Sequence, residues 1–400
     1  MNNKKINLKN FFAINNSIFS MLIMVMLVGM GEKMSERFLP IYLLALGGST
    51  VSIAFLNGMD NLLSALYSFP GGYLSNKIGY KNSLIVFTLI AMIGYALVII
   101  FPTWQIVILA AFLFISWTAI SLPAVMSLVS NVVPKNKRAM GVSIHSLVRR
   151  IPMALGPIVG GSLMSIYGTI KGMRIAFIIA LIFAFISIII VYFFVEDKQK
   201  NKESIKFLDM LKNIKGNLKI LLISDILIRF AEQIPYAFVV VWVVENNGLT
   251  TIDFGILTTI EMITSVIIYI PVAYFADKNS KKPFVLTTFI FFTLFPLVLI
   301  FSKSFKILIF AFIIRGLKEF GEPTRKSMIM DFSPEDEKAG TFGIYYLIRD
   351  VIVSIAVFMS AFLWNISPVV NFLVAFLFGL LGTIYFAIFG KDYKNLINNK

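Results

Sequence analysis

Long apolar segments recur along the whole chain, and they constrain its fold more than any other feature. At about 1.5 Å of rise per residue, a helix of about 20 residues crosses the hydrocarbon core of a bilayer. A segment in lipid must satisfy its own backbone hydrogen bonds, so each segment is expected to be a helix. The pattern predicts an all-α polytopic membrane protein with twelve transmembrane helices, in segments 18–46, 51–70, 83–101, 105–130, 139–166, 172–195, 217–245, 251–276, 283–301, 305–331, 339–365 and 368–390.

Composition indicates the same class. The chain is 58% hydrophobic and 14% charged, whereas soluble globular proteins are near 45–50% apolar and about 25% charged. It has no Cys and a single His, His145, so we expect no disulfide, no metal site and no cofactor. No nucleophile–base cluster is evident, so we expect no enzyme. The polar residues 1–10 precede an apolar run too long for a signal peptide, and none is expected.

The basic residues gather on one predicted side of the membrane. They lie at both ends of the chain, in the linker 196–219, and in loops at 77–81, 135–138, 278–282 and 338. The opposite loops carry few, namely Lys171, Arg174, Lys303 and Lys306. The positive-inside rule therefore predicts a protein of the cytoplasmic membrane with both termini cytoplasmic. This asymmetry explains the net charge of +15 without a nucleic-acid partner, and we expect a monomer in the lipid bilayer.

The two halves of the chain repeat. We predict a six-helix bundle over 1–195, a cytoplasmic linker over 196–216 and a second six-helix bundle over 217–400. Bundles that share one topology form a parallel repeat. Matching residues lie 200 or 201 positions apart in five pairs: Pro123/Pro323, Pro134/Pro334, Arg149/Arg349, Asp60/Glu261 and Lys77/Lys278.

Charges stand inside some of the apolar segments. Each charge at the centre of a lone membrane helix costs about 2.5–3.5 kcal/mol, so such groups must pair or face water within the protein. The first segment carries Glu32, Lys33, Glu36 and Arg37. By contrast, the interiors of segments 83–101, 172–195, 283–301 and 368–390 are free of charge. Every third segment is thus predicted to face lipid, and the others to enclose a central polar cavity.

The loop that follows the second segment carries a specific motif. Gly72, Asn76, Lys77, Gly79 and Lys81 are similar to the G-x-x-x-D-K/R-x-G-x-K/R loop of the major facilitator superfamily. The chain resembles that family over its whole length, with Asn76 where the family usually has Asp. The second half repeats the loop with Asp277 and Lys278.

A second motif lies in segment 139–166. Gly156, Pro157, Gly160 and Gly161 resemble the Gly-Pro motif of the family's exporters, in which small residues let helices approach closely. The family's Arg in the fourth segment is missing, and that segment offers Ser116, Trp117, Thr118 and Ser121 instead. The resemblance implies alternating access about a site near the middle of the membrane. It also implies that the first, fourth, seventh and tenth segments line the cavity.

The charged residues of the inward segments are the candidate cavity residues. Each is a substrate-binding or proton-coupling group, or else part of a structural ion-pair network. Arg149 and Arg349 bind an anionic substrate or brace the halves, for example through a bridge from Arg149 or Arg150 to Asp350. Arg325 and Lys326 are expected at the cytoplasmic mouth. The candidates are Glu32, Glu36, Arg37, Asp60, Arg149, Arg229, Glu232, Glu261, Arg315, Glu319, Glu322, Arg349 and Asp350.

Two of these candidates, Glu36 and Arg37, lie one turn before Pro40, where a bend would open the first helix toward the cavity. The buried carboxylates and the Gly-Pro motif favour proton-coupled export of a small molecule, that is, antiport. The alternative is proton-coupled uptake or facilitated transport of an organic anion, which the many arginines favour. A membrane sensor or an enzyme acting on lipid is a third possibility.

Overall fold

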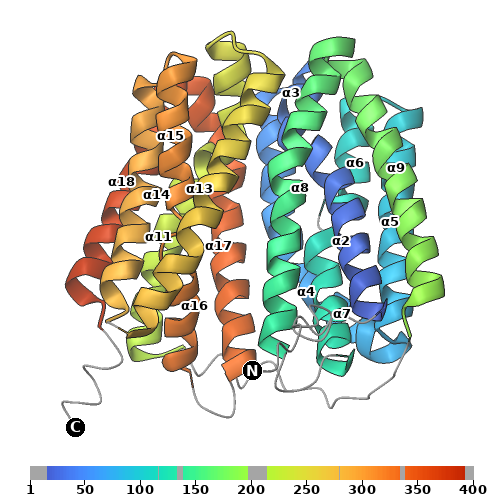
Figure 1. Cartoon of the computed structure of the whole chain (residues 1–400). Coiled ribbons are helices and arrows are strands. Elements are labelled where there is room, and N and C mark those ends of the chain that lie inside the picture. The colour runs from blue at the N-terminus through green and yellow to red at the C-terminus, as the bar shows by residue number, and fades with distance from the viewer. Residues whose placement is uncertain are drawn as a thin grey trace, which may run out of the picture. The chain divides into compact units, whose positions relative to one another are not determined.

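The computed structural model describes residues 16–115, 117–132, 138–196, 214–278, 280–333 and 338–391. Within those residues the secondary structure is helical, without strands. The chain forms two compact units (Figure 1). The first unit comprises 1–47 and 66–203, and the second comprises 48–65 and 204–400. The helix α4 (Thr50–Ile78) is therefore divided, and residues 50–65 belong by their contacts to the second unit.

The first unit is built around α2, which packs against α8 and α9. α5 packs against α6, α7 and α9. A Cβ on Gly31 of α2 would come within 2.8 Å of Ala180 in α9, so only a glycine permits this approach. The helices are α2 (Asn16–Ser35), η1 (Glu36–Phe38), α3 (Leu39–Ala45), the end of α4 (Thr50–Ile78), α5 (Tyr80–Ile100), α6 (Trp104–Phe114), α7 (Trp117–Val132), α8 (Arg138–Tyr167) and α9 (Thr169–Phe194).

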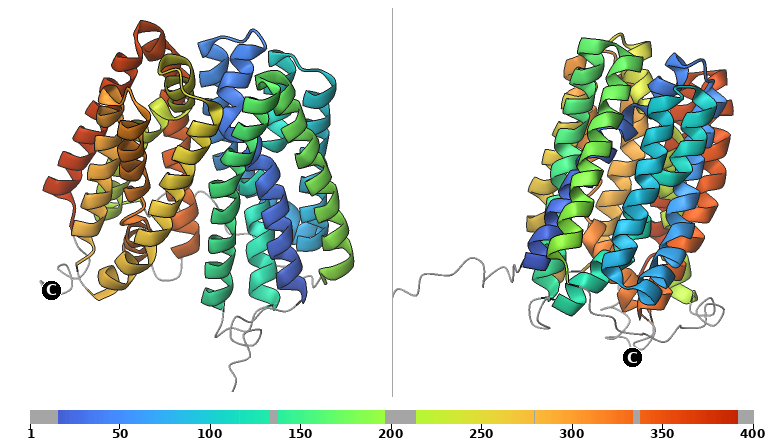
Figure 2. Two further views of the ribbon diagram at one scale, coloured as in Figure 1. Left: turned by 45° about the horizontal axis from the view of Figure 1, so that its top comes forward. Right: turned by 90° about the vertical axis from the view of Figure 1, so that its right-hand side faces the viewer.

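The second unit is centred on α11, which packs against α14, α17 and α18. α13 packs along α15, and Phe238 stacks on Trp364 with 4.6 Å between ring centroids. Both views of Figure 2 show the helices of each unit running roughly alongside one another. The helices are α11 (Gly216–Tyr236), α12 (Phe238–Val241), η4 (Trp242–Asn246), α13 (Thr251–Lys278), α14 (Lys282–Phe301), α15 (Phe305–Leu317), α16 (Glu322–Asp331), α17 (Lys338–Ile366) and α18 (Pro368–Phe389).

Helical breaks occur in four of the predicted segments, and these are the first, fourth, seventh and tenth. The first is interrupted by the 3₁₀ turn Glu36–Phe38, because Pro40 has no N–H to bond to the carbonyl of Glu36. This confirms an interruption just before Pro40. α6 ends at Phe114 and α7 begins at Trp117; α11 and α12–η4 are bent by 41°; α15 gives way to turns over 318–321 before α16.

Among the described residues seven spans are long and apolar enough to cross a membrane, one of them running over 104–121 from α6 into α7, and there are eight if the bent pair α11 and α12–η4 forms one span. The full number of twelve spans stays a prediction. Gly79 alone separates α4 from α5, and its φ of 85°, which a glycine readily adopts, lets the chain reverse there.

Candidate functional site

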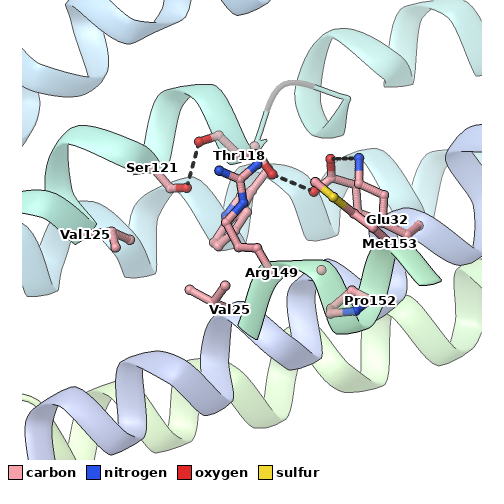
Figure 3. A pocket seen from close by; sticks show the side chains of 11 residues that line it. Val25, Glu32, Thr118, Ser121, Val125, Arg149, Pro152 and Met153 are labelled. Atoms are coloured by element: carbon pink, nitrogen blue, oxygen red, sulfur yellow. Dashed lines mark hydrogen bonds and ion pairs between the residues drawn. The ribbon is translucent and has the colours of Figure 1, made fainter. Parts of the chain in front are cut away.

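A small cavity in the first unit collects polar residues from three helices (Figure 3). Its volume is about 20 Å³, enough for about one water molecule. α2 contributes Val25, Gly29, Glu32 and Lys33; α7 contributes Trp117, Thr118, Ser121 and Val125; α8 contributes Arg149, Pro152 and Met153. The fourth predicted segment has no charged residue, and it lines the cavity with the hydroxyl groups of Thr118 and Ser121 instead.

Glu32 is the acid of this cavity, and its side chain is almost fully buried, with 4% of the residue exposed. Its Oε2 accepts a hydrogen bond from Thr118 Oγ1 at 3.0 Å, and its Oε1 lies 3.1 Å from Lys33 Nζ. Lys33 also forms an ion pair with Glu36. Because two carboxylates share one ammonium group, either can take a proton without leaving Lys33 unpaired.

Arg149 is the charged residue that α8 contributes to the wall of the cavity. It is half-buried and extends from α8 toward Thr118 (Figure 3). Glu32 and Glu36 are near enough to interact with it electrostatically. No hydrogen bond or ion pair joins Arg149 to any residue that the structure describes.

Small residues of α8 set the position of the charged part of α2. A Cβ on Gly156 would lie 2.7 Å from Lys33 Cβ, and one on Gly160 would collide with the backbone of Met34. Gly29 of α2 similarly makes room for the ring of Pro152. The Gly-Pro stretch thus presses α8 onto α2 directly beside Glu32 and Lys33.

The second unit contains a denser set of ion pairs. Glu232 pairs with Arg229 and, at 2.8 Å, with Lys318. Lys318 also lies 3.4 Å from Glu261, a fully buried acid whose Oε1 is 3.3 Å from Arg315 Nε. Each of these two glutamates therefore has two cationic partners, which fits the structural alternative for Glu261.

A second network surrounds Asp225 of α11, which is 1% exposed. It pairs with Arg325 and with Arg349 at 3.4 Å, and it accepts a hydrogen bond from Tyr345 at 3.0 Å. Arg349 also bonds to its neighbour Asp350 at 2.7 Å. Arg325, expected at the mouth, is buried in this network, and Tyr345 was not anticipated because a tyrosine in an apolar segment carries no distinctive signal.

The remaining candidates lie at the edges of these networks. Asp60 in α4 is half-buried, with Ser64 Oγ 3.5 Å away. Glu322 pairs with Arg325 at 2.7 Å and with the more exposed Lys326 at 3.4 Å. Arg37 and Glu319 are half-buried. Lys81 Nζ lies 5.3 Å from the ring centre of Tyr192, and Lys77 is exposed. The side chains of Gly72, Asn76, His145, Asp277 and Lys278, and residue Ser116, lie outside the described residues.

The repeat register relates the two sites residue by residue. Glu32 and Thr118 are 86 positions apart and hydrogen-bonded, and Glu232 and Lys318 are also 86 apart and bonded. Each pair thus lies 200 positions from its counterpart, as do Arg149 and Arg349. The sequence repeat is therefore also a repeat of contacts.

The charge balance of the two sites differs. Among the charged side chains of α2, η1 and α8 that the structure describes, four bases accompany two acids: Lys33, Arg37, Arg149 and Arg150 with Glu32 and Glu36. In the second unit, six bases face seven acids: Arg229, Arg315, Lys318, Arg325, Lys326 and Arg349 against Asp60, Asp225, Glu232, Glu261, Glu319, Glu322 and Asp350. Among these described groups the first unit has the surplus of positive charge.

Known proteins place this arrangement in a family. The sequence model of the Major Facilitator Superfamily matches the chain twice, over residues 21–231 and 221–399. The chain belongs to that superfamily. It is a multi-pass secondary transporter, of a family whose members are transporters and not enzymes. An uncharacterized MFS-type transporter of Methanocaldococcus jannaschii is 22% identical over 367 residues, which cover 88% of this chain and 90% of that protein.

Solved transporters have the same fold. A nucleoside transporter, NupG, superposes with a TM-score of 0.79 at 13% identity, over 94% of this chain and 100% of that one. A POT family transporter in complex with a thioalcohol-conjugated peptide gives 0.78 at 12% identity, over 95% and 96%. A bacterial homolog of the human lysosomal transporter Spinster gives 0.71 at 11% identity, over 96% and 98%. These likenesses confirm the predicted fold.

Proposed function

We propose that this chain moves a small molecule across the cytoplasmic membrane by alternating access, in a cycle coupled to protons taken up by Glu32. One observation carries the proposal: Glu32 is the carboxylate that lines the cavity, and it shares Lys33 with Glu36. A buried carboxylate of this kind gains and loses a proton with a change of local charge, which is what coupling requires. Both termini are proposed to be cytoplasmic and the protein to act as a monomer.

Two directions of coupling have support. Export in exchange for protons is supported by the Gly156–Gly161 stretch, which packs against α2 beside Glu32. Uptake or facilitated transport of an organic anion is supported by the surplus of bases in the first unit. The solved neighbours are a nucleoside transporter and peptide transporters, so a small polar molecule fits the range of cargo of this fold.

The test uses proteoliposomes and a compound that raises the unfolding midpoint of the purified protein, since a ligand that binds the native state stabilises it. In the wild type, an imposed pH gradient should drive net movement of that compound. Glu32→Gln should lose the movement driven by the pH gradient, yet keep exchange of labelled for unlabelled compound, because exchange needs no net proton transfer.

Glu36→Gln is the matched control, since Glu36 shares Lys33 but does not line the cavity. Movement opposite to protons identifies export by antiport, and movement with protons identifies uptake. Glu36→Gln should keep coupling to the pH gradient, and if Glu32→Gln keeps full coupling as well, Glu32 is structural and the proposal fails. Asp60 and Glu261 would then be the next carboxylates to replace.

A further inference from the structure

The second unit shows what occupies the position that is open in the first. There the guanidinium of Arg349 lies 3.4 Å from the carboxylate of Asp225, which also pairs with Arg325 and receives a hydrogen bond from Tyr345. All of these groups are buried. Arg349 is thus neutralised by Asp225 of α11 together with its own neighbour Asp350.

At the equivalent position in the first unit, 200 residues earlier, that carboxylate is absent. Two hundred positions before Asp225 and Arg325 stand Val25 and Val125, and both line the cavity beside Arg149. Two apolar side chains therefore replace the acid and its second base. Arg149 retains its place in the repeat, but no described residue forms a hydrogen bond or ion pair with it.

We propose that the cavity bounded by Val25, Val125 and Arg149 is a subsite for a carboxylate group of the transported molecule, at the place that Asp225 holds in the second unit. This inference rests on the proposed transport function. A guanidinium matches a carboxylate in a planar, two-point contact. The surplus of bases in the first unit supplies the charge that the ligand balances. In the ligand-free protein the cavity of about 20 Å³ holds one water-sized group, so only the end of a ligand enters it and not a whole metabolite.

The neighbouring hydroxyl group connects this subsite to the proton. Thr118 has one hydroxyl proton, which it donates to Glu32. A proton on Glu32 releases that donor for a carboxylate held by Arg149, and it removes a negative charge beside the ligand. Proton and carboxylate then bind together, which corresponds to transport of an acidic solute in the same direction as protons.

The subsite can be closed by a single substitution. Val25→Asp supplies a tethered carboxylate at the register of Asp225, and Glu36→Gln, which does not line the cavity, is the control. The probes are sodium acetate, lactate and succinate, each compared with sodium chloride at equal ionic strength. The measurement is the thermal unfolding midpoint of the purified full-length protein.

The wild type and Glu36→Gln should show a midpoint that rises with the logarithm of the concentration of at least one of these carboxylates. Val25→Asp and Arg149→Gln should lose the rise, and Arg149→Gln keeps the test open if Val25→Asp does not fold. A wild type that responds to none of the three salts overturns the proposal, as does an equal rise in Arg149→Gln. Glu32→Gln should keep the rise while losing coupling to the pH gradient, so failure of the subsite and failure of the proton proposal are distinguished.

Discussion

Replacing Asp225 by Asn tests whether the second unit depends on its buried charge network. The substitution keeps the size of the side chain and removes its charge, which leaves Glu322 as the acid beside Arg325 and Asp350 as the acid beside Arg349, with each arginine 2% exposed. Removing one partner of a buried ion pair costs about 3–5 kcal/mol, because the two buried guanidinium groups lose the carboxylate that they share and gain no water in its place. The unfolding equilibrium should therefore shift by roughly two to three and a half powers of ten.

The assay is reversible chemical unfolding in mixed micelles, followed by circular dichroism of the full-length protein. Asp331→Asn is the matched control in the same unit. Asp331 pairs with Lys281 at 2.6 Å, but its side chain is 27% exposed, so its loss should cost at most about 1 kcal/mol.

A second substitution separates charge from packing. Adding Arg325→Gln to Asp225→Asn removes one of the two cations that shared Asp225, so the double variant should be more stable than Asp225→Asn alone. If Asp225→Asn costs no more than Asp331→Asn, or if the double variant is the less stable of the two, the guanidinium groups are compensated by other means and the reasoning is refuted.

Two further outcomes are expected. Gly160→Leu should destabilise the first unit by several kcal/mol, since even a Cβ there collides with the backbone of Met34. The control Gly343→Ala, where a Cβ meets nothing within 4 Å, should be neutral or slightly stabilising in the same unfolding assay. Equal effects of the two substitutions would exclude close packing as the cause. Arg315→Lys should cost about 1–2 kcal/mol, because the guanidinium lies 5.1 Å from the ring centre of Phe295 and an ammonium group fits that contact less well; an unchanged unfolding midpoint would show that the ring contributes nothing.

The helical architecture could be predicted because each signal is local in the sequence. Apolar length marked the spanning segments, and the reversal at Gly79 and the break before Pro40 follow from the chemistry of single residues. Repetition at 200 positions also marked Arg149 and Arg349 as equivalent. None of these features depends on a contact between residues that are distant in the sequence.

Pairing could not be predicted, because it depends on which side chains of different helices converge. Asp225 and Arg229 lie one helical turn apart in α11, yet Asp225 pairs with Arg325 and Arg349 from α16 and α17. The openness of the first site depends on Val25 and Val125, and a valine in a membrane segment gives no sign of function. Only the structure shows that these valines stand where the second unit has an ion pair.

The long sequence separation within the ion pairs has a consequence for biosynthesis. α11 brings Asp225, Arg229 and Glu232 into the membrane, but Lys318 follows Glu232 by 86 residues and Arg325 follows Asp225 by 100. During translation Asp225 and Glu232 precede their partners in other helices by several segments. The nascent chain must therefore hold α11 in a hydrated or chaperoned setting, such as the insertion machinery, until α15–α17 emerge. Truncated chains that end before residue 318 should be recognised as unassembled and degraded.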